Sequence, residues 1–281
     1  MKKRLLSALL ALALVFVLLP TTALAEVVTT NGDISIAGKC WNFTKSTSGY
    51  ETVYYQVQSN NGVFSTSLDN KTGCVWPTNP YLEITRTGNT ITVIVHNKVT
   101  ITTNKGTNNA AEECIEVNKS NNQTTTLNLV IKGAEGTTNN TLTLECKSYG
   151  SALSSYQGGI TITGGVTVNA KSTYTNSSTG VSARAINVFN GDLTISGTGT
   201  TVNAENKDRN HPTIDVKNAV TISDGATLTA KNTNGGKAIS CRSITADGYD
   251  FMGRSGNSGS YTTLTGDDKA TKLQEYSSIQ I

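Results

Sequence analysis

The densest group of side chains able to do chemistry lies in residues 207–215, which read Lys-Asp-Arg-Asn-His-Pro-Thr-Ile-Asp. Carboxylates and guanidinium groups make directed hydrogen bonds to sugar hydroxyls or to an anionic group, and an imidazole adds a donor or acceptor near neutral pH. We therefore expect ligand contacts from Asp208, Arg209, His211 and Asp215. The plainer alternative is a solvated loop whose opposite charges compensate one another.

Three more residues join this predicted site if successive stretches of the chain stack on one another. Tyr174 and Arg184 precede the group, and Lys237 follows it. Two arginines can hold a carboxylate, and a tyrosine ring can pack against the apolar face of a sugar. Tyr149 and Tyr156 offer further aromatic faces on the same side.

The elements that must position these residues are strands in a repeat. The longer repeated segment occurs as ITITGGVTVNA (160–170), LTISGTGTTVNA (193–204) and VTISDGATLTA (220–230). A shorter apolar segment also recurs, as AINV (185–188), TIDV (213–216) and AISC (238–241). Self-similarity at a period of this length is typical of solenoid folds. The spacing varies mainly between the longer segment and the next short one, which predicts variable loops on one side.

Apolar and polar residues alternate within each repeated segment. Ile160 and Ile162 face one way, whereas Thr161 and Thr163 face the other. Three such strands per coil, each burying one face, predict an all-β fold. We expect a right-handed parallel β-helix, a three-sided solenoid of about six coils with an N-terminal cap, because right-handed crossovers are the rule for parallel strands.

The pattern divides the chain into four segments. Residues 1–25 have a basic start, an apolar run and the small-residue end Ala-Leu-Ala, which predict a signal peptide and a secreted, extracellular or cell-surface protein. Residues 26–81 are rich in aromatic residues and predict the cap. Residues 82–246 carry the β-helix, and residues 247–281 form a closing segment that ends in a strand. The apolar run of the leader is short for a membrane span, so none is expected.

Charge and cysteine content argue against two classes of function, nucleic-acid binding and metal binding. The formal net charge is +3, but three of the 23 basic residues lie in the leader, which leaves 20 against 20 acidic residues. A near-neutral chain argues against a nucleic-acid partner. No Cys or His spacing typical of a metal site is present, and neither is a catalytic motif. Cys40 and Cys74 are the expected disulfide pair, Cys146 is expected in the buried column of Ala170, and Cys114 has no assigned role.

The strings GDLTISGTGTTVNA (191–204), PTIDVKNAVTISDGATLTA (212–230) and GGKAIS (235–240) resemble bacterial secreted β-helix proteins labelled carbohydrate-binding domain-containing. The resemblance covers roughly residues 82–246. It implies a cell-surface module that binds plant or microbial polysaccharide, with calcium held by Asp-rich turns in some members. The matching turn here, residues 207–215, is poorer in acid, so the resemblance gives calcium little support and no cofactor is expected.

Three classes of function remain. The first is a non-catalytic carbohydrate-binding or adhesive surface protein with a polysaccharide or glycan as partner, and we favour it. The second is a polysaccharide lyase or hydrolase of the pectin-degrading β-helix type, which needs converging carboxylates. The acids near the central repeats are scattered; they are Asp192, Asp208, Asp215 and Asp224. The third is a structural surface spacer without a ligand.

Overall fold

The computed structural model describes residues 32–58, 61–65, 81–103, 112–118, 125–175, 183–246, 248–256, 258–265 and 269–281. The expected signal peptide lies outside these residues. Cys74 also lies outside them, so its pairing with Cys40 stays a prediction. The described residues are mostly strand, with one short helix, α2 (Lys269–Leu273). The expected all-β class is therefore confirmed. None of the described helices is long and apolar enough to span a membrane.

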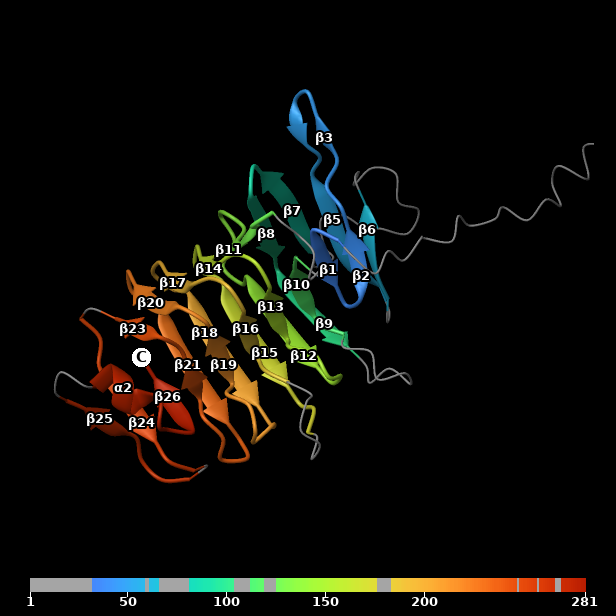
Figure 1. The fold of residues 1–281 in the computed structure, drawn as a ribbon. Coiled ribbons are helices and arrows are strands. Elements are labelled where there is room, and N and C mark those ends of the chain that lie inside the picture. The colour runs from blue at the N-terminus through green and yellow to red at the C-terminus, as the bar shows by residue number, and fades with distance from the viewer. Residues whose placement is uncertain are drawn as a thin grey trace, which may run out of the picture.

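Most described strands belong to three large sheets that the chain visits in rotation (Figure 1). Sheet 1 has the order β2-β1-β10-β13-β16-β19-β22. Its strands are short because each is bounded by corners of the fold. They are β1 (Ile34–Ile36), β2 (Lys39–Trp41), β10 (Ile115–Val117), β13 (Leu153–Ser155), β16 (Ile186–Val188), β19 (Ile214–Val216) and β22 (Ile239–Ser240).

Sheet 2 has the order β23-β20-β17-β14-β11-β8-β7-β5-β6. Its strands are β5 (Val53–Gln58), β6 (Asn61–Ser65), β7 (Tyr81–Thr87), β8 (Thr90–His96), β11 (Asn128–Gly133), β14 (Ile160–Thr163), β17 (Leu193–Ser196), β20 (Ala219–Ser223) and β23 (Ser243–Thr245). A separate hairpin, β3 (Lys45–Ser46) and β4 (Gly49–Tyr50), projects near its N-terminal end (Figure 1).

Sheet 3 has the order β25-β24-β26-β21-β18-β15-β12-β9. Its strands are β9 (Lys98–Thr103), β12 (Thr141–Cys146), β15 (Thr167–Ser172), β18 (Thr201–Asn206), β21 (Thr227–Asn232), β24 (Phe251–Arg254), β25 (Thr262–Leu264) and β26 (Ser278–Gln280). One strand from each sheet makes a circuit. The described strands form four complete circuits, β10–β12, β13–β15, β16–β18 and β19–β21, with partial circuits β8–β9 and β22–β23, against an expectation of about six coils.

Equivalent residues of successive circuits stand beside one another in parallel register. Ile162 pairs with Ile195, and Ile195 pairs with Ile222. Ile186 and Ile214 likewise pair in sheet 1. The repeat therefore stacks as the sequence predicted, because the inward isoleucines fill one column while the backbone groups of each strand bond to the next circuit.

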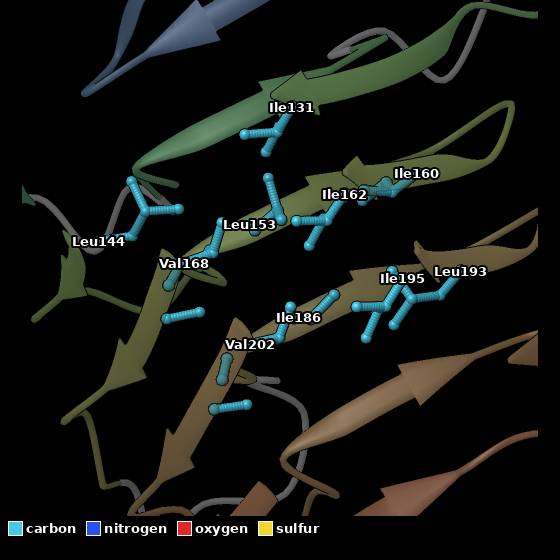
Figure 2. Packing of buried hydrophobic residues seen from close by; sticks show 14 of the residues in the cluster. Ile131, Leu144, Leu153, Ile160, Ile162, Val168, Ile186, Leu193, Ile195 and Val202 are labelled. Carbon is cyan, nitrogen blue, oxygen red and sulfur yellow. The ribbon is translucent and has the colours of Figure 1, made fainter. Parts of the chain in front are cut away.

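The core is the space enclosed by the three sheets. Figure 2 shows Ile162, Ile195, Val168 and Val202 pointing into it from neighbouring circuits, and each is at most 1% exposed. The alternate residues of the same strands, such as Thr161, are only partly buried. The expected alternation of inward and outward residues is thus confirmed.

Antiparallel strands occur at both ends of the parallel stack. β7 is antiparallel to β8, so parallel pairing begins at Thr90 rather than at residue 82. β1 is antiparallel to β10 in sheet 1. At the other end β26 is antiparallel to β21. Antiparallel additions change the direction of the ladder and limit continued stacking of identical edges.

One expectation about a single residue is corrected. Leu144, not Cys146, pairs with Ala170; Cys146 is two residues further on and pairs with Ser172. The error arises because the period-two pattern permits a shift of two residues without changing faces. Cys146 is nevertheless fully buried.

Candidate functional site

A hollow of about 340 Å³ lies on the outer face of sheet 1, between the ends of β16 and β19. The residues lining it are Asn187, Val188, Phe189, Asn190, Asp215 and Lys217. We call it the β16–β19 hollow. It combines one aromatic ring with carboxylate, amide and ammonium groups, which is the mixture of surfaces found in sites for small polar ligands.

The repeat places these side chains. Ile186 and Val188 point into the core, so Asn187 between them faces outward and stands in register with Asp215 of the next circuit. Asn187 is only 6% exposed and forms the floor of the hollow. Phe189 directly follows β16 at the corner between sheets 1 and 2, where no further inward position is left for it.

Phe189 is the exposed large hydrophobic residue of the described chain, with 42% of its surface accessible. Its ring stacks on that of Tyr156, with centroids 4.8 Å apart and an interplanar angle of 6°. Phe189 lines the hollow, whereas Tyr156 does not. Burial, followed by the charges of Glu116 and Glu113, raises the pKa of Tyr156, which keeps its hydroxyl protonated.

Arg184 and Asp215, both predicted as site residues, form an ion pair. Arg184 Nε donates to Asp215 Oδ2 at 2.7 Å, and the two side chains are 13% and 31% exposed. Arg184 Nη1 is buried and has no hydrogen-bond partner among the described residues. Since Asp215 lines the hollow, Arg184 fixes the orientation of the carboxylate that a ligand would meet.

Asp208 and His211 form a second pair, at the corner between sheets 3 and 1. Asp208 Oδ2 lies 2.7 Å from His211 Nδ1, and Asp208 Oδ1 accepts from the amide of Asn210 at 2.9 Å. Asp208 is only 2% exposed. Its carboxylate is occupied within its own loop, so it contributes to the shape of the loop and presents little surface to a ligand.

Two buried asparagines hold this loop, and sequence reasoning missed them. Asn206 Nδ2 donates to the carbonyl oxygens of Ala183 (3.0 Å) and His211 (3.2 Å), while its Oδ1 accepts from the amide of Asp208 at 3.0 Å. Asn232, paired with Asn206 in the next circuit, donates to the carbonyl of Asp208 at 2.7 Å. The signal was present in the repeat, because both follow the inward alanine of their strand by two residues.

The remaining predicted residues do not converge on the hollow. Tyr174 is buried against Tyr149, with ring centroids 4.5 Å apart, and a hydrogen bond with Tyr149 raises the pKa of Tyr174 to about 12. The charge of Asp208 also contributes to this shift. Arg209 and Lys237 are exposed. Thus Asp215 lines the β16–β19 hollow and Arg184 holds its carboxylate, while the others belong to the neighbouring loops.

A second hollow, of about 250 Å³, lies on the outer face of sheet 2. His96 Nε2 is 3.1 Å from Glu83 Oε2 and its ring stacks on Tyr81, with centroids 4.2 Å apart. Lys132 and Glu135 also line this hollow. An imidazole beside a carboxylate is a common acid–base arrangement, so this hollow is the second candidate site. In the part of the chain that is described, no three His, Cys, Asp or Glu side chains gather to hold a metal ion.

Comparison with known proteins gives no information on the role of either hollow. No protein-family model, no curated protein and no solved structure matches this chain. The chemical role of the β16–β19 hollow therefore rests on its exposed ring, its oriented carboxylate and its amides.

Proposed function

We propose that this chain is a secreted or cell-surface, non-catalytic carbohydrate-binding protein built on a right-handed parallel β-helix. The right-handed path is the one that parallel crossovers almost always take. Secretion is supported by the basic and apolar leader in residues 1–25, and carbohydrate binding by the sequence resemblance. We place the glycan site in the β16–β19 hollow.

The observation that carries the proposal is the exposed ring of Phe189 above a polar floor. Sugars have apolar C–H faces that pack on aromatic rings, and hydroxyl edges that pair with carboxylates and amides. Phe189 offers the first surface, while Asn187 and Asp215 offer the second. Because Tyr156 backs the ring and Arg184 holds Asp215, a ligand loses little affinity to ordering of these side chains.

A polysaccharide lyase or hydrolase is the second candidate function. The observation in its favour is the His96–Glu83 pair in the hollow of sheet 2, where an imidazole could take up a proton next to bound polysaccharide. A structural spacer without a ligand is the third candidate, and its support is the long stack of strands alone.

The test measures retention of the exported protein on a panel of insoluble and gel-embedded polysaccharides, with calcium and with chelator. Wild type, Phe189→Ala and Phe189→Trp are compared, and each supernatant is analysed for released sugars. We expect retention of wild type and Phe189→Trp without sugar release, and loss of retention for Phe189→Ala. Release of unsaturated or reducing ends would favour the enzyme, and absence of retention on every polysaccharide would leave the spacer.

A further inference from the structure

Two buried cysteines stand at the two ends of the first complete circuit. Cys114 directly precedes β10, and Cys146 is the last residue of β12. Both side chains are 0% exposed. Neither takes part in the proposed glycan site, and sequence reasoning assigned Cys114 no role.

The contacts of each cysteine place them against one another. Cys146 Sγ donates to the carbonyl of Glu112, two residues before Cys114, at 3.3 Å, and to that of Gly150 at 3.1 Å. The amide of Cys114 donates to the carbonyl of Ser151, the neighbour of Gly150, at 3.4 Å. The two thiols also hydrogen-bond to each other.

We propose that Cys114 and Cys146 form a disulfide bond when the protein is exported, which closes the first complete circuit into a covalent ring. The inference takes export from the proposed function and is independent of glycan binding. Oxidising compartments preserve such bonds, whereas the cytosol keeps thiols reduced.

The chemistry is thiol–disulfide exchange with a disulfide donor, such as oxidised glutathione or a disulfide oxidoreductase. One of the two cysteines, as its thiolate, attacks the donor disulfide and releases the first thiol of the donor. The thiolate of the other cysteine then attacks the cysteine sulfur of this mixed disulfide and releases the second. The donor is reduced by two electrons and gains the two protons that the cysteines lose. Both cysteines are buried in the folded chain, so exchange precedes closure of the corner.

The position of the bond gives it a structural role. The circuit β10–β12 is where parallel stacking meets the antiparallel strand β1. Beyond it lie only the partial circuit β8–β9 and antiparallel strands, so it stands near one end of the parallel stack, and a solenoid opens from its ends. A link across the ring Cys114–Cys146 reduces the conformational freedom of the unfolded circuit, and by loop length we expect reduction to lower Tm by roughly 7–15 °C.

Peptide mapping without reduction tests the proposal. Trypsin cleaves after Lys105, Lys119, Lys132 and Lys147, which puts Cys114 in peptide 106–119 and Cys146 in peptide 133–147, each with one cysteine. Exported protein, alkylated before unfolding, should give the two peptides joined, with a mass two hydrogens below their sum. Protein made in a reducing cytosol should give them alkylated separately once it is unfolded.

A double variant tests whether the disulfide bond, rather than burial of the two thiols, accounts for the stabilisation. Cys114→Ala/Cys146→Ala keeps small apolar side chains at both positions, and its Tm should match that of reduced wild type and be insensitive to reductant. Alkylated single peptides from exported wild type, or a cross-link of either cysteine to another partner, would overturn the proposal. Glycan retention is measured on the same samples, so failure of the disulfide and failure of carbohydrate binding give different results.

Discussion

Phe189 stacks face to face on Tyr156 of the preceding circuit, with ring centroids 4.8 Å apart and an interplanar angle of 6°. This separation equals the spacing of neighbouring strands in a sheet, about 4.8 Å. A parallel stack therefore places equivalent aromatic residues in contact without any adjustment of the backbone. The repeat itself thus builds a rigid aromatic surface at the edge of the β16–β19 hollow.

The first prediction concerns Tyr156. Tyr156→Ala removes the ring behind Phe189, so Phe189 gains rotamer freedom that glycan binding must then restrict. We expect retention to weaken by roughly 3- to 10-fold, with a stability loss of about 0.5–1.5 kcal/mol from the stacked pair. Affinity electrophoresis in gels containing the retained polysaccharide measures the first, and urea unfolding the second. Tyr156→Phe keeps the stack and should behave as wild type. Equal retention by Tyr156→Ala would contradict the role of Tyr156 as a support.

The second prediction concerns the ion pair of Arg184 with Asp215. Asp215→Ala leaves a largely buried guanidinium without its carboxylate and removes an acceptor from the hollow. We expect a loss of about 1–3 kcal/mol in unfolding free energy, below the value for a fully buried pair because Asp215 is partly exposed. Glycan retention should fall as well.

The matched control is the exposed pair Lys171–Glu205, whose side chains are 40% and 37% accessible. Glu205→Ala should change the unfolding free energy by at most about 1 kcal/mol and leave retention unchanged. Similar losses of unfolding free energy in Glu205→Ala and Asp215→Ala would show that the Arg184–Asp215 pair stabilises the protein no more than an exposed ion pair does.

The repeat made the fold predictable and the site only in part. The alternation around Ile162 and its copies fixes which residues face the core, and the structure confirms that alignment. Arg184 and Asp215, both predicted as ligand contacts, form an ion pair, and their contact with a ligand stays a prediction. Phe189 was not selected, because the alternation places it outward after the inward Val188 but does not show what its ring contacts at the corner.

Side-chain networks within a corner were also beyond the sequence pattern. Asp208 and His211 read as ligand contacts because both are polar and lie in a variable loop. Their carboxylate and imidazole instead bond to each other, and Asn206 bonds to the backbone around them. Polar residues in a loop give no periodic signal, so the sequence alone does not separate a loop-shaping side chain from one that faces a ligand.

The third prediction concerns the buried asparagine Asn206. Asn206→Ala removes the side chain that bonds to the carbonyl of Ala183 and the amide of Asp208 in a buried corner. We expect a loss of about 2–4 kcal/mol in unfolding free energy, since each unsatisfied buried group costs about 1–3 kcal/mol. The control is Asn203→Ala on the same strand, where the exposed side chain bonds only to Asn169 among the described residues. It should stay within about 0.5 kcal/mol of wild type. Equal effects of the two substitutions would refute the role of Asn206.

The last prediction concerns Gly158, which lies two residues after Tyr156 at the same corner. Its φ of +121° is open to glycine but strained for other residues, and a Cβ there would collide with the backbone carbonyl of Leu127 in the preceding circuit. Gly158→Ala should therefore lower the unfolding free energy by about 3–5 kcal/mol, from strain and overpacking together. It should also reduce glycan retention, because the corner carries the ring on which Phe189 rests.

The control for this substitution is Gly136→Ala, at a glycine with φ +73° and open space around the added Cβ. It has the backbone strain without the collision, so we expect a loss of about 1–2 kcal/mol and unchanged retention. Urea unfolding and polysaccharide retention on both variants separate the two contributions. If Gly158→Ala is no less stable than Gly136→Ala, the close approach of the two circuits at this corner does not exclude a side chain at position 158. The tight corner would then not be what holds Tyr156 and Phe189 in register.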